Sequence, residues 1–358
     1  MPLICRIFNF ESEPLPNIVN GPFLLAANHN TDLDPVLLSA ATDAHMYFVA
    51  SEHVLRGGIG AWLLKKLFAP IARLKGATDA SAAMAILRKL RGGANVCLFA
   101  EGNRSFNGIT GAVFPATGKM VKAAGCYLIT YRFEGGYFTS PRWSTGLRRG
   151  VMRGRPVRVF SPAQLKSMSA AEINEAIATD IFEDAYERQA EENVAFRGKR
   201  LAEKLETALF VCPCCEKAGT MSSRGDELKC KCGMSARYDE KGYLHGAPFS
   251  TVTEWDAWQS AKLAELAKKD SVLCHDDDIL LAELTPKGEK HICRGELSLS
   301  ANGLRIGDVQ MPLREISDMA IVGRGRIMLT SGEGHYELRG NRSFCGRKYF
   351  LFYKLLKG

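Results

Sequence analysis

Short apolar runs alternate with helical segments over the first 200 residues, and this alternation constrains the fold more than any other feature of the chain. Four apolar runs are typical of buried strands: 23–27, 46–50, 96–100 and 127–131. Helical patterns lie between them at 35–41, 59–74 and 80–91. We expect Asp34 to cap the first of these helices, with Pro35 at its first position. Strands that alternate with helices predict a layered α/β fold.

The C-terminal part of the chain follows a different pattern, in which apolar and polar residues alternate from about Ile279 to Gly340. Turn signals such as Asn302-Gly303 separate the alternating runs, as in antiparallel hairpins. An amphipathic helix is expected at 348–356. Several strands followed by one helix resemble a small pleckstrin-homology-like barrel, and a generic β-meander satisfies the pattern equally well.

Helical segments are also expected between these two parts. Residues 169–209 are strongly charged and helical in pattern, and Ser169 with Glu172 has the spacing of a capping box. Residues 252–269 form another helical pattern. No apolar run approaches the ~18 residues of a membrane-spanning helix, and the N-terminus lacks the apolar core of a signal peptide. We divide the chain into residues 1–209, 210–250 and 251–358, and we expect any contact with a membrane to be peripheral.

Five of the eleven cysteines lie close together between Cys212 and Cys232. This distribution does not fit a disulfide framework, and it indicates a reducing compartment with one metal site. The predicted ligands of a structural zinc ion in a zinc ribbon are Cys212, Cys215, Cys230 and Cys232. Because the second pair is spaced by one residue instead of two and Cys214 is left over, a redox thiol cluster is the alternative. A segment this poor in apolar residues is expected to need the metal to fold.

Positive charge is concentrated between Arg56 and Arg158, where the sequence has 18 lysines and arginines but only three acids, in a chain of net charge +8. Such a cluster indicates an anionic partner, which can be phospholipid, a phosphorylated substrate or nucleic acid, or else a solvated face without a partner. Residues 59–73 are apolar, contain a tryptophan and a lysine pair, and fit an interfacial helix and a core helix equally well. The arginines of 148–158 form a basic run suited to anionic lipid. Nucleic acid is less favoured because aromatic residues other than Trp143 are missing from this run.

His29 and Asp34 form a candidate catalytic pair where the first apolar run ends. An aspartate five residues after a histidine, at the start of a helix, can accept a hydrogen bond from the imidazole and fix its tautomer. The other ring nitrogen can then act as a general base, as in the His–Asp half of a triad, and the nucleophile would be a hydroxyl of the substrate. Taken alone, this spacing also fits a helix-capping aspartate beside an unrelated histidine.

A second polar block, Glu101-Gly102-Asn103-Arg104-Ser105, follows the third apolar run. Gly102 permits a close approach of the backbone, and Arg104 offers a bidentate fork for phosphate. Glu101 can brace this arginine or accept a hydrogen bond from a substrate hydroxyl. The block also fits an ordinary turn with a surface ion pair.

Together the two blocks resemble the glycerolipid acyltransferase family, which includes the 1-acylglycerol-3-phosphate acyltransferases. The resemblance is carried by Asn28-His29-x4-Asp34, followed about seventy residues later by Phe99-x-Glu101-Gly102-x-Arg104-Ser105. The lead-in segments 13–16 and 21–25 are similar to those of the family as well, and the resemblance covers residues 10–160. It implies a mixed sheet flanked by helices and an acyltransferase domain at 1–209.

The resemblance also implies a mechanism. His29 would deprotonate an acceptor hydroxyl while Asp34 orients the imidazole, and the oxygen would attack the thioester of acyl-CoA or of an acyl carrier protein. The residues that would hold a lysophosphatidic acid-like acceptor are Arg73, Glu101, Gly102, Arg104 and Ser105. The expected role is phospholipid biosynthesis by a cytoplasmic protein, peripheral on the inner face of the cell membrane.

The chain departs from the family's pattern in two places. The strand at 127–131 lacks the proline that is common in the family's fourth block, and Asn103 stands where threonine is frequent. These departures put the acceptor's identity in doubt more than the chemistry. A membrane lipid-binding adaptor with little activity is the alternative function, and a nucleic-acid-binding protein built around the zinc ribbon ranks third.

Overall fold

The computed structural model describes residues 3–17, 20–56, 58–74, 80–269, 272–285, 288–341 and 343–358. The chain divides into two compact units. The first comprises Met1–Leu74, Asp79–Arg142 and Leu147–Gly198, and the second includes Trp143–Gly146 and Lys199–Gly358. The predicted three-part division of the chain stays a prediction.

The first unit is built on a seven-stranded sheet with strand order β1-β7-β6-β2-β5-β3-β4. All neighbouring strands are parallel except β6 and β7, which are antiparallel, so the predicted mixed sheet is confirmed. The strands are β1 (Phe10–Ser12), β2 (Phe23–Ala27), β3 (Met46–Ser51), β4 (Ile71–Arg73), β5 (Asn95–Phe99), β6 (Tyr127–Glu134) and β7 (Met152–Phe160).

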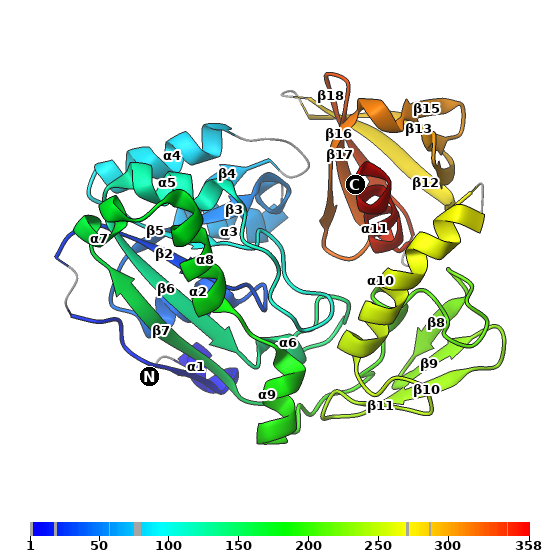
Figure 1. Ribbon diagram of the computed structural model, residues 1–358, viewed down its shortest axis with the longest axis horizontal. Helices are drawn as coiled ribbons and strands as arrows, with labels where there is room; N and C mark the ends of the chain where they lie inside the picture. Colours follow the sequence, from blue (N-terminus) through cyan, green and yellow to red (C-terminus); the bar gives the residue numbers. More distant parts are fainter. Residues whose placement is uncertain are drawn as a thin grey trace. The chain divides into compact units, whose positions relative to one another are not determined.

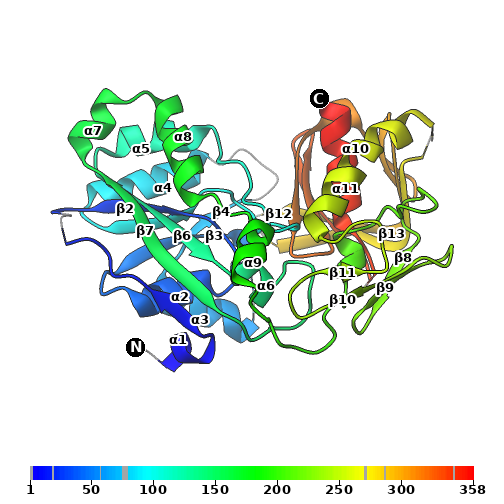
Figure 2. The same ribbon diagram turned by 60° about the horizontal axis from the view of Figure 1, so that its bottom comes forward.

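Helices cover both faces of this sheet, which is the layered α/β architecture expected from the sequence (Figure 1). Figure 2 shows α4, α5, α7 and α8 on one face and α1, α2 and α3 on the other. Each face has its own apolar core, because alternate residues of the central strands point to opposite sides. The helices of the unit are α1 (Leu3–Ile7), α2 (Asp34–Ala41), α3 (Gly58–Phe68), α4 (Ala80–Arg91), α5 (Ala116–Ala124), α6 (Gly136–Thr139), α7 (Pro162–Ser167), α8 (Ala170–Ile181) and α9 (Ala185–Glu192), with a 3₁₀ turn at Glu52–Leu55.

Three local expectations need correction. The helix expected at 59–74 ends at Phe68, because Pro70 interrupts it and the chain continues as strand β4. Asp34 is the first residue of α2 and not its cap, which is Leu33. The helical region expected at 169–209 ends at Glu192, since Asn193 adopts a left-handed conformation there with φ of 53°. The capping box of Ser169 and Glu172 is confirmed at the start of α8.

The second unit contains a four-stranded antiparallel sheet, a long helix and a seven-stranded antiparallel sheet. The first sheet comprises β8 (Met221–Arg224), β9 (Glu227–Cys230), β10 (Ser235–Tyr238) and β11 (Leu244–His245), and α10 (Val252–Lys269) follows it. Trp255 Nε1 donates to the carbonyl of Val211 at 2.9 Å, which anchors the start of the cysteine segment on α10. Arg347 of the last helix pairs with Asp256 of α10 at 2.7 Å, and both side chains are buried.

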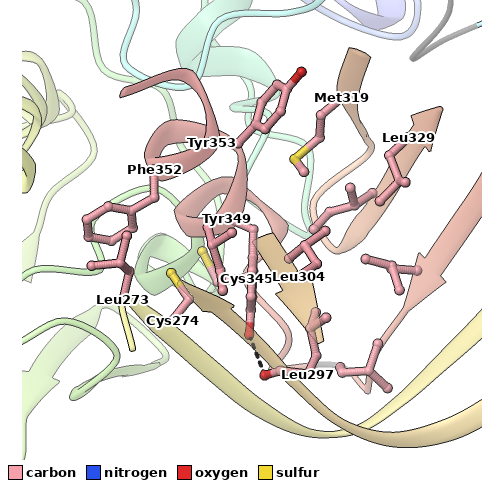
Figure 3. Close-up of a cluster of buried hydrophobic side chains, with 14 of the residues drawn as sticks. Leu273, Cys274, Leu297, Leu304, Met319, Leu329, Cys345, Tyr349, Phe352 and Tyr353 are labelled. Carbon is pink, nitrogen blue, oxygen red and sulfur yellow. Dashed lines mark hydrogen bonds between the residues drawn. The ribbon is translucent and has the colours of Figure 1, made fainter. Parts of the chain in front are cut away.

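The large sheet of the second unit has strand order β15-β14-β13-β12-β18-β17-β16, and the closing helix α11 (Gly346–Lys357) packs on it. Tyr349, Phe352 and Tyr353 of this helix lie in the core, and the Tyr349 hydroxyl donates to the carbonyl of Leu297 at 3.2 Å (Figure 3). The expected alternation and terminal helix are therefore confirmed, while the likeness to a pleckstrin-homology barrel stays a prediction. The strands are β12 (Cys274–Thr285), β13 (Gly288–Ser300), β14 (Gly303–Ile306), β15 (Val309–Pro312), β16 (Ile316–Val322), β17 (Arg326–Ser331) and β18 (Gly334–Arg339), with 3₁₀ turns at Leu205–Thr207 and Leu313–Glu315.

Candidate active site

The two polar blocks meet at the carboxyl ends of the neighbouring parallel strands β2 and β5. Ala27 of β2 stands opposite Phe99 of β5, so the residues two positions further on, His29 and Glu101, leave the sheet at the same edge. The backbone N–H of His29 donates to Glu101 Oε1 at 2.7 Å. This edge is where parallel α/β sheets commonly hold their ligands.

His29 and Asp34 are in direct contact. His29 Nδ1 lies 2.9 Å from Asp34 Oδ2, and the imidazole stacks on Phe99 with ring centroids 4.3 Å apart. Asp34 is fully buried and also accepts hydrogen bonds from the backbone N–H groups of Asn30, at 2.7 Å, and Thr31, at 3.0 Å. The carboxylate is therefore held rigidly, and it fixes the orientation of the imidazole.

This geometry leaves one ring nitrogen of His29 available. When Nδ1–H donates to the carboxylate of Asp34, Nε2 carries a lone pair and can accept a proton. The His29 side chain is 20% exposed, whereas Asp34 is not exposed at all. A partly accessible imidazole backed by a buried carboxylate has the arrangement that a general base requires.

Glu101 holds the backbone on both sides of the site. Besides the N–H of His29, it accepts the N–H of Gly111 at 2.5 Å through Oε2, so both carboxylate oxygens are engaged. The sequence suggested that Glu101 braces Arg104 or binds the substrate. In the structure its carboxyl group instead accepts the backbone N–H groups of His29 and Gly111. Burial raises the pKa of Glu101 to about 8, although the hydrogen bonds from Gly111 and His29 act in the opposite direction.

The raised pKa of Glu101 predicts a pH-dependent contribution to folding stability. Between pH 4.5, the ordinary pKa of a glutamate, and pH 8, the Glu101 carboxyl keeps its proton in the folded state and loses it in the unfolded state. The stabilisation from this proton is therefore complete below pH 4.5 and is lost as the pH rises through about 8. We expect the free energy of unfolding of wild type, minus that of Glu101→Gln, to fall as the pH rises from 5 to 8 and to level off above it. Chemical denaturation across this range measures the difference, and a pH-independent difference contradicts the prediction.

Gly102 and Arg73 lie together beside the Glu101 turn. Gly102 has φ of +68°, and a Cβ atom at this position would stand 2.2 Å from the ring of Phe114, so a larger residue would be strained here and would displace the ring. The Arg73 guanidinium stacks on the same ring, with Cζ 4.4 Å from its centroid, and Nη1 would be 3.2 Å from that Cβ position. Strand β4 thus brings a partly buried cation to the second polar block.

Arg104 connects the two blocks. Its side chain is 11% exposed, and its guanidinium forms an ion pair with Asp32 at 3.1 Å and donates to the carbonyl of Ser140 at 3.1 Å. Asp32 belongs to the loop between His29 and Asp34, and it is 81% exposed. The Ser105 hydroxyl stays within its own turn, where it accepts the N–H of Gly108 at 2.9 Å.

Sequence reasoning missed a buried polar network behind His29. Asn28 exchanges two hydrogen bonds with the backbone of Phe133, at 2.8 and 2.7 Å, which ties the loop after β2 to strand β6. Asn30 Nδ2 donates to Glu183 at 2.8 Å, and Glu183 also accepts from the N–H of Gly135 at 3.0 Å. Burial raises the pKa of Glu183, and the neighbouring Arg188 opposes this rise. Glu183 follows helix α8 in a highly charged region, so no local signal could have singled it out.

A second candidate site lies in the cysteine segment of the second unit. The Sγ atoms of the four predicted ligands all lie within 4.8 Å of one another. Cys212 Sγ is 3.7 Å from Cys232 Sγ, and Cys215 Sγ is 3.7 Å from Cys230 Sγ. Cys214 is exposed and stands outside the cluster. Four converging thiols fit a tetrahedral metal ion with no open position, which is the donor set of a structural site.

The family comparison covers the part of the chain that contains both polar blocks. Residues 7–134 match the model of the Acyltransferase family. No curated protein matches the sequence. Among solved structures, the chain is similar to the 1-acyl-sn-glycerophosphate (LPA) acyltransferase PlsC from Thermotoga maritima, with 20% sequence identity and a TM-score of 0.45 over 51% of this chain and 73% of that one. The matched range contains His29, Asp34, Arg73, Glu101 and Arg104.

Proposed function

We propose that the protein transfers a fatty acyl group from a thioester donor to the hydroxyl of a phosphate-bearing lysolipid, and the match of residues 7–134 to the Acyltransferase family model supports this proposal. The donor is acyl-CoA or an acylated carrier protein, and the acceptor is a lysophosphatidic acid-like lysophospholipid. The observation that carries the proposal is the His29–Asp34 contact at 2.9 Å, at the sheet edge where both polar blocks meet.

The proposed reaction needs no acyl-enzyme intermediate. His29 Nε2 removes the proton of the acceptor hydroxyl, and the oxygen attacks the thioester carbonyl. The tetrahedral intermediate then collapses, the C–S bond breaks, and the imidazolium returns the proton to the leaving thiolate. The products are an ester and a free thiol, and Asp34 stabilises the imidazolium between the two proton transfers.

Arg73 and Arg104 are the proposed partners of the acceptor's phosphate. Arg73 is partly buried beside Gly102, and stacking on Phe114 holds its guanidinium in place. Arg104 is held by Asp32, whose exposed side chain can turn away when a phosphate arrives. Arginine suits this role because its planar fork can bind two phosphate oxygens at once.

Removal of the Arg73 charge is expected to lower the activity only with acceptors that bear a phosphate. For Arg73→Gln we expect kcat/KM with lysophosphatidic acid to fall roughly 10- to 100-fold, which corresponds to the ~1.5–3 kcal/mol of a charged hydrogen bond. Monoacylglycerol, which lacks the phosphate, should be affected much less. The matched control is Arg88→Gln, an exposed cation of helix α4. Equal losses with both acceptors would show that Arg73 does not recognise the phosphate.

We also propose that the face bearing α1 and α3 lies on the membrane. Leu3 and Ile7 of α1 are 74% and 57% exposed, and Trp62 and Leu67 of α3 are 57% and 66% exposed. Both helices cover the same face of the sheet (Figure 2). The exposed pair Lys65 and Lys66 adds positive charge to α3. The proposed contact is peripheral, with the apolar side chains of α1 and α3 at the interface. Within the described residues, no helix is both long enough and apolar enough to cross a membrane.

Trp62→Ala combined with Leu67→Ala is expected to weaken binding to phospholipid vesicles by at least about tenfold, since each large apolar side chain that enters the interface contributes on the order of 1–3 kcal/mol. Vesicle co-sedimentation measures the loss. Met84→Ala is the control, because Met84 is 56% exposed on helix α4, which covers the opposite face of the sheet. If the control variant loses as much binding as the double variant, this face is not the docking surface.

A further inference from the structure

The second unit contains an open cavity of about 840 Å³ at the edge of its large sheet, around strands β13, β14 and β15. Its size is within the range of small-molecule sites in proteins. Polar side chains make up much of the lining: Ser298, Asn302, Arg305, Gln310, Arg314 and Lys357. Among the described residues, no aspartate or glutamate lines this cavity.

The charged side chains that line the cavity are all positive. Arg305, Arg314 and Lys357 are all exposed, and in the part of the chain that the structure describes none of them forms an ion pair. Other cations on the same sheet are neutralised, as when Arg294 pairs with Asp278 at 2.9 Å. Three unpaired cations that share one cavity repel each other, and an anion bound between them would relieve this repulsion.

The backbone around the cavity is fixed before any ligand binds. Arg305 stands directly between Ser298 and Gln310 in the strand register, so these three side chains share one face of the sheet. The N–H of Leu313 donates to the carbonyl of Asn302 at 2.9 Å, which ties the β13–β14 turn to the residues that follow β15. A rigid frame lowers the entropic cost of binding.

One glycine makes this frame possible. Gly303 has φ of +134°, and a Cβ atom there would lie 2.2 Å from the carbonyl oxygen of Met311. The strands β14 and β15 can therefore approach each other closely only because this position lacks a side chain.

We propose that this cavity binds a phosphate-bearing anion. Arg305 and Arg314 supply planar forks for phosphate oxygens, Lys357 supplies a point charge, and Ser298 and Gln310 offer neutral hydrogen bonds. Val272, which is 50% exposed, and Leu313 add apolar surface to the lining. The phosphate belongs either to a lipid headgroup in a bilayer or to a soluble phosphate ester. The site is independent of the proposed acyl transfer, because every residue that forms it lies in the second unit.

The test compares two triple variants of the full-length protein. The site variant combines Arg305→Gln, Arg314→Gln and Lys357→Gln, all at exposed positions where folding is least affected. The control combines Arg224→Gln, Arg237→Gln and Lys268→Gln, which removes the same charges from exposed positions of the same unit outside the cavity. Binding is measured to vesicles of equimolar phosphatidylcholine and phosphatidic acid, and to glycerol 3-phosphate in solution.

We expect the site variant to bind roughly 100-fold more weakly, since each cation near an anionic surface contributes about 1 kcal/mol, while the control stays near wild type. Because the first unit has its own proposed phosphate contacts, hydrogen exchange must locate the binding. Protection of residues 298–314 by vesicles alone indicates a lipid headgroup, and protection by glycerol 3-phosphate as well indicates a soluble phosphate ester. The proposal is overturned if neither probe protects residues 298–314, or if the two triple variants lose the same amount of binding affinity.

Discussion

Replacement of His29 by alanine is expected to lower the rate of acyl transfer by about 10²- to 10⁴-fold, because the acceptor hydroxyl would lose its general base. The readout is the release of free thiol from an acyl-CoA donor in the presence of lysophosphatidic acid. Folding should be little affected, since the His29 side chain is partly exposed and its backbone N–H contact with Glu101 survives the substitution.

The control for this experiment is His45→Ala, which removes an exposed histidine of the same unit away from the sheet edge. Its activity should match wild type. Asp34→Asn is expected to lose activity as well, because an amide no longer stabilises an imidazolium at the 2.9 Å contact. If His29→Ala keeps more than about a tenth of the wild-type rate, the general-base role of His29 is wrong.

Loss of one thiol from the four-cysteine cluster is expected to abolish metal binding and to unfold the segment around it. Zinc sites of this type contribute roughly 10–16 kcal/mol of apparent free energy, which is more than the stability of a typical domain. Cys212→Ser, Cys215→Ser, Cys230→Ser and Cys232→Ser should therefore each lose the zinc ion and hydrogen-exchange protection in residues 210–246.

Cys214→Ser provides the matched control, because Cys214 belongs to the same segment but is exposed and lies outside the cluster. This variant should keep one zinc ion per chain and the stability of wild type. Elemental analysis and thermal unfolding measure both quantities. The zinc prediction fails if wild type purified with zinc present carries none, or if Cys214→Ser loses zinc as readily as the other four variants.

The parts of the fold that the sequence predicted well depend on local signals. The buried run Phe23–Ala27 is strand β2, and the capping box of Ser169 and Glu172 starts helix α8. Both features depend on residues that are close together in the sequence. The helix Val252–Lys269 has the expected bounds. The expectation of a helix over 59–74 failed because the apolar run was given more weight than Pro70. Arg73 was named as a site residue, but the strand β4 that carries it was not expected.

The sequence predicted the motif residues of the candidate site, but not the residues that hold those motifs in place. The spacing of His29 and Asp34 allowed their contact, and the parallel pairing of β2 with β5 brings Glu101 beside them. The contribution of Glu183 could not be foreseen, because it approaches Asn30 from 153 positions further along the chain. Contacts at that sequence distance are set by tertiary packing and leave no local pattern.

The basic run at 148–158 shows how far charge counts can mislead. Arg153 pairs with Glu192 at 2.8 Å, Arg155 with Glu134 at 3.6 Å and Arg158 with Asp180 at 2.7 Å. Arg148 is buried. Much of the positive charge that suggested an anionic partner is thus neutralised within the first unit. This weakens the prediction that the run binds nucleic acid or lipid.

The most direct test of the central proposal is acyl transfer by the zinc-loaded wild-type protein. Labelled acyl-CoA and labelled acyl carrier protein are each offered with a panel of lysophospholipids on vesicles, and the ester product is identified. We predict an ester of lysophosphatidic acid or of a related phosphate-bearing lysolipid, formed together with one free thiol per ester. If neither donor yields any ester while the protein still binds the vesicles, the acyltransferase proposal is contradicted and the lipid-binding adaptor becomes the better account.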